Sequence, residues 1–306
     1  MLGWQGSEVL TPTLSRQWER GNERGYALAW TSAFAARFSR KSYRGRTWYS
    51  PNTKMRWNIG PFGVKDLFTL VNLMGGVGAI VFVVEGNLPA AGTALLLGFL
   101  LGDTLDGPVA RMTGTSNKFG SELDTATDHF VQAIAPAVIV YAAYARGGHA
   151  AAGLVLMALV VACGTIRQAL FSVAKMGDPL MYCGLPRTVS GYGAMAYVLS
   201  HLFFALNPAR YAVGAVVIAA FSLLNLLPIP YMTHRGARRM QVYVQLLAFG
   251  FLVTPVTTFF VARDYVFDVL FFWMLGYTAT GWIPIYPAEK RAFYARYRAW
   301  AKEVSG

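Results

Sequence analysis

The sequence predicts an all-α membrane protein with several transmembrane helices, and three observations support this fold class. The chain of 306 residues is 55% hydrophobic and only 14% charged, and its mean hydropathy is +0.39. A soluble globular domain has about 25% charged residues. Apolar runs long enough to cross a bilayer as helices recur along most of the chain. The net charge of +12 comes from residues that flank these runs, so we expect them to contact anionic lipid headgroups rather than nucleic acid.

A polar and basic N-terminal extension, residues 1–65, precedes the first apolar run. Residues 1–17 lack the apolar run and the early basic cluster of a signal peptide, so we expect insertion to depend on the first transmembrane helix. Residues 26–38 are the one helix-like stretch of this extension, and basic residues follow them directly. This stretch is either an amphipathic helix in the membrane interface or part of a loosely ordered tail.

Eight apolar segments follow, and we assign them to one membrane domain over residues 66–288. The first segment contains residues 75–78, three of which are glycine, and such small residues let neighbouring helices approach closely. A basic tail, residues 289–306, comes after the last segment. The second predicted span starts near residue 89 and runs into an aspartate-rich stretch, and the other spans are approximately residues 67–84, 120–144, 150–171, 189–206, 211–227, 242–261 and 265–285.

The distribution of Lys and Arg predicts the orientation of these helices. Of the 27 Lys and Arg residues, 24 lie in the two terminal segments or in turns on the same side of the predicted bundle. The opposite side holds Arg146, Arg210 and Arg263. Cytoplasmic loops carry an excess of positive residues. We therefore expect an integral, multi-pass membrane protein, in the inner membrane if the source is bacterial, with both termini and the turn at residues 111–119 in the cytoplasm.

Residues 103–128 hold four aspartates in a chain that has only 15 acidic residues. On a helix, Asp103 and Asp106 share one face, and Asp124 and Asp128 share one face of the next helix. A turn between the two helices would bring these faces together. Carboxylates repel one another in apolar surroundings unless cations neutralise them, and hard divalent cations prefer oxygen ligands. The stretch therefore predicts a site for two Mg²⁺ or Mn²⁺ ions, a type of site that clamps a diphosphate.

Small residues surround these aspartates. Gly107, Ala110 and Gly120 leave space beside the acidic faces, and Arg111 adds a positive charge. Glycine allows a backbone or a ligand to come close, although small residues also serve tight helix packing in membranes. Because these residues occur together with four aspartates, we favour a space that accepts a flat base or a diphosphate.

The run Asp-x-x-Asp-Gly-x-x-Ala-Arg-(x8)-Gly-x-x-x-Asp-x-x-x-Asp at residues 103–128 resembles the signature of the CDP-alcohol phosphotransferase family at every fixed position. The resemblance covers roughly residues 65–230 and implies a six-helix catalytic core, to which the last two predicted spans are added. It also implies an activity. Members of this family transfer a substituted phosphate from a CDP-linked donor to an alcohol and release CMP.

The resemblance implies a role for each residue of the signature. Asp103, Asp106 and Asp124 would hold two divalent cations on the diphosphate. Asp128 would help to hold the metal and would act as the general base on the acceptor hydroxyl, which is a poor nucleophile until a base removes its proton. The CDP pocket would be lined by Gly107, Ala110, Arg111 and Gly120.

Stretches outside the signature resemble the bacterial and archaeal phosphatidylserine synthases of this family. Residues 164–172 resemble a polar stretch of that group, residues 184–186 its Gly-Leu-Pro turn, and residues 227–231 the end of its sixth helix. The resemblance implies CDP-diacylglycerol as the donor and L-serine as the first choice of acceptor. Leu170 and Ser172 differ from that group, and phosphatidylcholine synthases of the family also resemble this chain, so choline, inositol phosphate and glycerol phosphate remain alternative acceptors.

Basic residues after the signature are candidates for binding the acceptor. Arg167 ends a predicted helix on the cytoplasmic side, where it either clamps a carboxylate or phosphate or extends to the lipid headgroups. Lys118, Lys175 and Arg187 would supply further positive charge for an acceptor that bears a phosphate.

Two other functions must be weighed against an enzyme. Intramembrane aspartates also occur in transporters and proton relays, which spread acidic residues over several helices. Here the later spans contain only Asp264 and Asp268, near a loop. A catalytically inactive scaffold would more readily have lost one of the four aspartates. We therefore expect an enzyme of phospholipid biosynthesis and, because members of the family are often dimers, a homodimer.

Overall fold

The computed structural model describes residues 58–59, 62–113, 117–174, 181–233 and 238–305. The chain divides into two compact units, Met1–Lys54 and Met55–Gly306, and all of the described residues belong to the second. Residues 26–38, for which an interfacial helix and a loose tail were the alternatives, and the candidate Lys175 lie outside the described residues.

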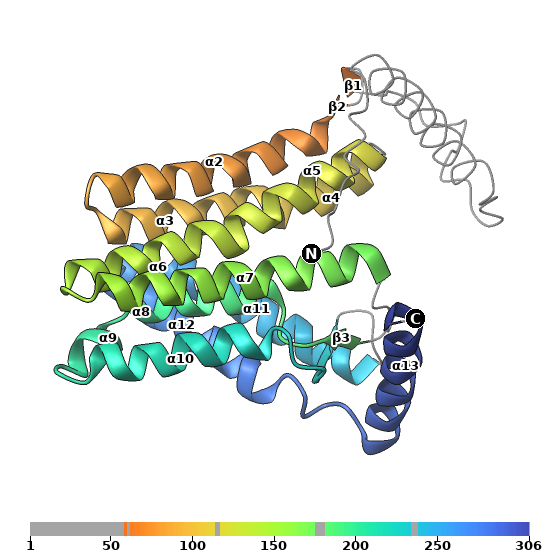
Figure 1. Cartoon of the computed structure of the whole chain (residues 1–306). Coiled ribbons are helices and arrows are strands. Elements are labelled where there is room, and N and C mark those ends of the chain that lie inside the picture. Colours follow the sequence, from red (N-terminus) through yellow and green to blue (C-terminus); the bar gives the residue numbers. More distant parts are fainter. Residues whose placement is uncertain (1–57, 60–61, 114–116, 175–180, 234–237, 306) are drawn as a thin grey trace, which may run out of the picture. The chain divides into compact units, whose positions relative to one another are not determined.

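The described part of the chain is built almost entirely from helices that lie side by side (Figure 1). The helices are α2 (Val64–Val84), α3 (Leu88–Gly98), α4 (Thr104–Thr113), α5 (Lys118–His129), α6 (Ala135–Arg146), α7 (Ala150–Ala174), α8 (Arg187–Leu199), α9 (His201–Ala205), α10 (Arg210–Leu224), α11 (Arg238–Val261), α12 (Val266–Thr280) and α13 (Pro287–Ser305). Two π-helical turns, η1 (Phe99–Asp103) and η2 (Phe130–Ile134), and a 3-10 turn, η3 (Arg263–Tyr265), join some of them. The short strands β1 (Asn58–Ile59) and β2 (Phe62–Gly63) form one antiparallel pair, and β3 (Met181–Cys183) and β4 (Pro230–Met232) form another.

The predicted all-α membrane architecture is confirmed. Among the described residues, four helices are long and apolar enough to cross a membrane, namely Val64–Val84, Leu88–Thr113, Ala150–Leu170 and Arg238–Val261. Helical segments also occupy the other four predicted positions, but they are shorter or interrupted. For example, α8 and α9 are separated at Ser200, and α10 and α12 have 15 residues each. Large apolar side chains are exposed on the outside of the bundle, as a lipid-facing surface requires, among them Val84, Val216, Leu246, Phe249, Phe260 and Phe272.

Helix α8 lies in the core of the bundle. Residues 189–198 are buried without interruption, so this helix is covered on all sides rather than along one stripe. Its small residues make that possible. A Cβ atom on Gly191 would lie 1.8 Å from the backbone oxygen of Gln132, and a Cβ on Gly193 would lie 2.6 Å from the ring of Phe221. Glycine therefore lets α8 pack directly against η2 and α10.

We predict that Gly191→Ala destabilises the protein, because its methyl group would overlap a backbone atom that cannot rotate away. Overpacking of a filled core costs about 1–3 kcal/mol. The measurement is the midpoint of thermal unfolding in detergent. Gly276→Ala is the matched control, because nothing lies within 4 Å of a Cβ at that helical position. Equal midpoints for the two variants would contradict the packing described for α8.

Glycines also bring α2 against the helix that carries the first aspartates. A Cβ on Gly75 would lie 2.6 Å from the Cα of Gly98, and a Cβ on Gly102 would lie 2.6 Å from the backbone nitrogen of Asn72. The predicted close approach of helices at residues 75–78 is thus present, and Gly98 and Gly102 are the partners on α3 and η1. This packing fixes the position of η1, which ends at Asp103.

Candidate active site

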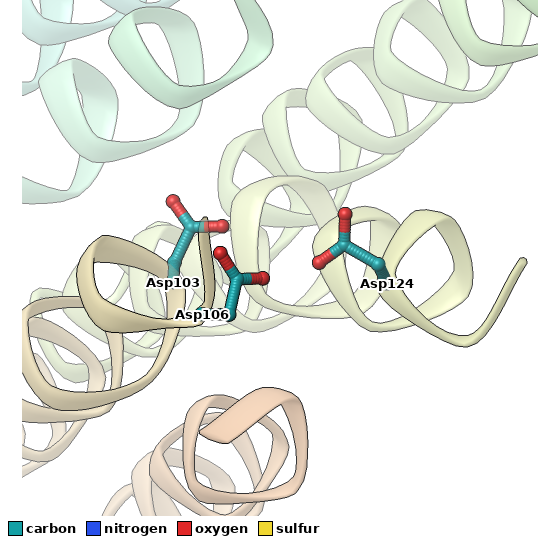
Figure 2. A group of neighbouring side chains, drawn as sticks. All are labelled: Asp103, Asp106 and Asp124. Carbon is teal, nitrogen blue, oxygen red and sulfur yellow. The ribbon is translucent and has the colours of Figure 1, made fainter. Parts of the chain in front are cut away.

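Three aspartates from two neighbouring helical segments converge on one point (Figure 2). Asp103 is the last residue of η1, Asp106 follows in the first turn of α4, and Asp124 faces them from α5. One carboxylate oxygen from each residue lies within 4.8 Å of the others. A cluster of hard oxygen ligands with this spacing suits Mg²⁺ or Mn²⁺.

The local sequence explains how the aspartates reach this arrangement. The turn η1 is π-helical immediately before α4, and Pro108 inside α4 has no backbone N–H to donate. Single π-helical turns often occur at functional sites, because they rotate the side chains that follow. The next helix, α5, is fixed at its start by Asn117, whose side-chain oxygen accepts a hydrogen bond of 2.7 Å from the Gly120 N–H.

The fourth aspartate, Asp128, lies one turn after Asp124 and pairs with an arginine from α8. Its Oδ2 is 3.8 Å from Nη2 of Arg187, at the first residue of that helix. Burial lowers the pKa of the Arg187 guanidinium, while Asp128 and the neighbouring aspartates oppose that change, and an arginine stays charged at neutral pH. Oδ1 of Asp128 and Nη1 of Arg187 are buried and have no hydrogen-bond partner among the described residues. Both groups therefore retain capacity to bind a ligand.

A polar cavity of about 270 Å³ opens beside this pair. It is lined by two carboxylates, those of Asp103 and Asp128, and by two guanidinium groups, those of Arg167 and Arg187. A small molecule that bears both a positive and a negative group would find charges of both signs in it. The other lining residues are Gln132, Gln168, Tyr182, Pro186 and Thr188.

The sequence suggested that Arg167 either binds a carboxylate or phosphate or extends to the lipid headgroups. The structure shows a further, structural role. Its side chain is buried, and Nη1 donates hydrogen bonds of 2.6 Å to the backbone oxygens of Cys183 and Asn225. These bonds join the end of α10 to the turn before α8. Gly184 in that turn has a φ of 76°, and a Cβ there would lie 2.5 Å from the Asn225 oxygen. Arg167 therefore does not extend to the headgroups, and it reaches the cavity from a fixed position.

The four residues expected to line a CDP pocket have different surroundings. A Cβ on Gly107 would have its nearest neighbour at 3.5 Å, in the Arg111 guanidinium, so open space remains beside the aspartates. Arg111 is exposed and Ala110 is buried. The space beside Gly120 is instead filled by the chain itself. A Cβ there would lie 2.4 Å from Oδ1 of Asp66, a residue that forms an ion pair with Lys65.

The lining of the polar cavity differs in part from the acceptor-binding residues that the sequence suggested. Lys118 is the exposed first residue of α5 and does not line the polar cavity. Gln132 and Gln168 do line it. Both could have been found in the sequence, because each is an amide side chain in an otherwise apolar stretch. Gln132 lies one turn after Asp128, and Gln168 directly follows Arg167.

His129, directly after Asp128, contacts helix α7. Its Nε2 lies 3.2 Å from Oγ1 of Thr165 on α7. This contact indicates a structural role for His129.

Comparisons with known proteins support the family resemblance of the aspartate signature. Residues 63–285 match the family model described as CDP-alcohol phosphatidyltransferase, so the match extends beyond residue 230 to the end of the last two predicted spans. An archaetidylserine synthase of Methanothermobacter thermautotrophicus is 30% identical over 168 residues, which cover 54% of this chain and 68% of that protein.

Two relatives named CDP-diacylglycerol--serine O-phosphatidyltransferase are also similar. The protein from Helicobacter pylori is 34% identical over 122 residues, which cover 40% of this chain and 51% of the relative. The protein from Methanocaldococcus jannaschii is 30% identical over 125 residues, which cover 40% of this chain and 54% of the relative. The chain thus matches about half the length of each of these two relatives.

Proposed function

This chain belongs to the CDP-alcohol phosphatidyltransferase family, and we propose from that premise that it transfers a phosphatidyl group from CDP-diacylglycerol to L-serine. The observation that carries the proposal is the convergence of Asp103, Asp106 and Asp124 beside a cavity that also contains Asp128 and Arg187. The names of the similar proteins support a serine acceptor.

The residues of the cluster fit two divalent cations. Asp103, Asp106 and Asp124 offer oxygen ligands at short mutual distance, and Asp128 adds a carboxylate on the same face of α5. When bound, Mg²⁺ or Mn²⁺ would neutralise the diphosphate and the charge that develops on the departing CMP. Gly107 leaves space for the donor next to this cluster, and the exposed Arg111 is available for its phosphate groups.

In the proposed reaction, Asp128 accepts the proton of the serine hydroxyl. The hydroxyl oxygen forms a bond to the phosphorus that carries the diacylglycerol, the bond from this phosphorus to the CMP oxygen breaks, and CMP leaves. Arg187 favours the ionised form of Asp128 and helps to orient it, because its guanidinium lies 3.8 Å from that carboxylate. General base catalysis of this kind requires a carboxylate within hydrogen-bond reach of the hydroxyl.

The charges of the polar cavity favour serine over choline. L-Serine bears an ammonium group and a carboxylate, and the cavity is lined by carboxylates and guanidinium groups that can bind them. Choline has no carboxylate, so two arginines would face its cation without an anion to bind. Inositol phosphate and glycerol phosphate need more positive charge, but Lys118 lies outside the cavity and one Nη of Arg167 is already bonded to backbone oxygens.

We predict that Arg187→Gln raises the KM for serine about 10- to 150-fold, because a hydrogen bond to a charged group contributes about 1.5–3 kcal/mol. The KM for CDP-diacylglycerol should change much less. Arg238→Gln is the matched control, because Arg238 is exposed at the start of α11 and does not line the cavity. An unchanged KM for serine in Arg187→Gln would exclude Arg187 as the group that binds the serine carboxylate.

The function is tested by measuring CMP release from CDP-diacylglycerol by the purified protein with Mn²⁺. Serine, choline, inositol phosphate and glycerol phosphate are compared as acceptors. We expect the highest kcat/KM with serine. A preference for choline would overturn the choice of acceptor, and no CMP release with any of the four would contradict the transferase activity.

The proposal includes an orientation and an assembly state. Basic residues flank the ends of the helices on the aspartate side, and the positive-inside rule then puts the active site and both termini in the cytoplasm. We also propose a homodimer, on the basis of the resemblance to the family.

A further inference from the structure

Gln132 is a polar residue in the core of the bundle whose side chain has no hydrogen-bond partner. The residue is 5% exposed, and its neighbours in the chain, Val131 and Ala133, are buried as well. Within the described part of the chain, its amide group makes no hydrogen bond. Burial of a carboxamide without a partner costs free energy, and native proteins seldom tolerate it. The unpartnered amide therefore indicates that a ligand binds to it.

The polar cavity is the place where this ligand would bind. Gln132 lines the cavity together with Asp128, one helical turn earlier, and with Arg187. Among the described residues, the buried Oδ1 of Asp128 and the buried Nη1 of Arg187 also lack hydrogen-bond partners. Three side chains thus offer unused donors and acceptors to one space of about 270 Å³. Ligand sites fix a small molecule through a few convergent polar groups of this kind.

The backbone around Gln132 is fixed by a direct contact with α8. Gln132 is the third residue of the π-helical turn η2, and π-helical turns are frequent at functional sites. Its backbone oxygen faces Gly191, where a Cβ atom would come within 1.8 Å of it. Because α8 begins at Arg187, this contact holds two elements of the cavity lining against each other. The amide can therefore meet a ligand without rearrangement of the helices.

We propose that Gln132 binds the ammonium group of the acceptor and thereby selects a primary amine, an inference that rests on the proposed transfer to L-serine. In that reaction the serine hydroxyl contacts Asp128 and the carboxylate contacts Arg187, which leaves the ammonium group for Gln132. The amide oxygen, Oε1, accepts a hydrogen bond from an N–H of this group.

This contact distinguishes serine from an acceptor with a quaternary ammonium group. Choline has no N–H on its nitrogen, so it would leave the Gln132 amide oxygen buried without a partner. A site that is built to hydrogen-bond an N–H group discriminates strongly against an analogue that lacks it. The selection thus acts on the hydrogen atoms of the ammonium group and adds to the selection by charge.

The first test compares acceptor binding by Gln132→Met and by wild-type protein. Methionine has a side chain of similar length but no amide. We expect the KM for L-serine to rise about 10- to 150-fold, with a much smaller change in kcat because Asp128 remains. The inhibition constant of 3-hydroxypropanoate, which is serine without its ammonium group, should stay nearly unchanged. Gln245→Met is the matched control, because Gln245 is exposed on α11 and does not line the cavity.

The outcomes separate this inference from the proposed function. If wild-type protein is active with serine, an unchanged KM in Gln132→Met would overturn the inference alone. Equal losses for serine and 3-hydroxypropanoate would also overturn it, because Gln132 would then bind a group that the two molecules share. Wild-type protein without CMP release would contradict the transferase function, and the role of Gln132 would be decided by the binding measurement that follows.

The second test measures thermal unfolding in detergent with Mn²⁺ and does not depend on turnover. Without an acceptor, Gln132→Met should unfold at the wild-type temperature or above it, because the variant lacks the unpaired amide. L-Serine should raise the midpoint of wild-type protein more than that of the variant, whereas 3-hydroxypropanoate should shift both equally. Equal shifts with serine would overturn the proposal. A lower midpoint of the variant without an acceptor would also overturn it, since the amide would then stabilise the fold itself.

Discussion

Asp128→Asn is expected to lower turnover by about 10²- to 10⁴-fold, because it removes the carboxylate that accepts the proton of the acceptor hydroxyl. An amide has the same shape but cannot take up that proton at neutral pH. The Asp128 carboxylate has one oxygen near Arg187 and one buried oxygen with no partner among the described residues. The second oxygen is available to the acceptor. Because Asp103, Asp106 and Asp124 remain, CDP-diacylglycerol should still bind.

The measurement is kcat for CMP release with saturating serine, together with direct binding of labelled CDP-diacylglycerol. Glu122→Gln is the matched control, since Glu122 is an exposed acid on the same helix. The control should retain wild-type turnover. Normal turnover by Asp128→Asn would show that another group is the base, and loss of donor binding would show that Asp128 acts mainly as a metal ligand.

The second large effect that we expect is a loss of activity when divalent cations are removed. Three carboxylates with oxygens within 4.8 Å repel one another, so they need cations both to hold their arrangement and to accept a diphosphate. Protein treated with a chelator should release no CMP, and Mn²⁺ or Mg²⁺ should restore the rate. Bound cation should also stabilise the fold by about 2.7 kcal/mol at a concentration 100 times its Kd.

Variants of the cluster sharpen this test. Asp124→Asn should raise the Mn²⁺ concentration needed for half-maximal rate, since it removes one of the three convergent ligands. The thermal unfolding midpoint measured against Mn²⁺ concentration gives a readout that does not depend on activity. Full activity in the presence of excess chelator would contradict the metal site.

Much of the fold followed from the sequence, because lipid demands long apolar helices with charges at their ends. The positions of α2, α7, α10 and α11 agree with the predicted spans. The π-helical turns η1 and η2 were not predicted, since a pattern of apolar residues does not reveal an extra residue in one turn. The 15-residue helix α12 is shorter than its predicted span, because the apolar run continues into the turns that follow it.

The acidic half of the site could be predicted, whereas the cavity beside it could not. The spacing of the four aspartates on two adjacent helices is local information. The cavity depends on contacts between residues far apart in the chain, such as the bonds from Arg167 to the backbone of Cys183 and Asn225. No local pattern identifies which basic residue has a structural role, so the sequence did not reveal that Arg167 also holds the backbone of Cys183 and Asn225.

The most direct test of the account is the ratio of two products in a single reaction. Purified protein is incubated with CDP-diacylglycerol, labelled L-serine and Mn²⁺, and the CMP released and the serine recovered in lipid are both quantified. The account predicts one labelled lipid molecule for each CMP, and neither product when serine or the cation is omitted. CMP release without serine-labelled lipid would contradict it, because the donor would then be hydrolysed or transferred to a different acceptor.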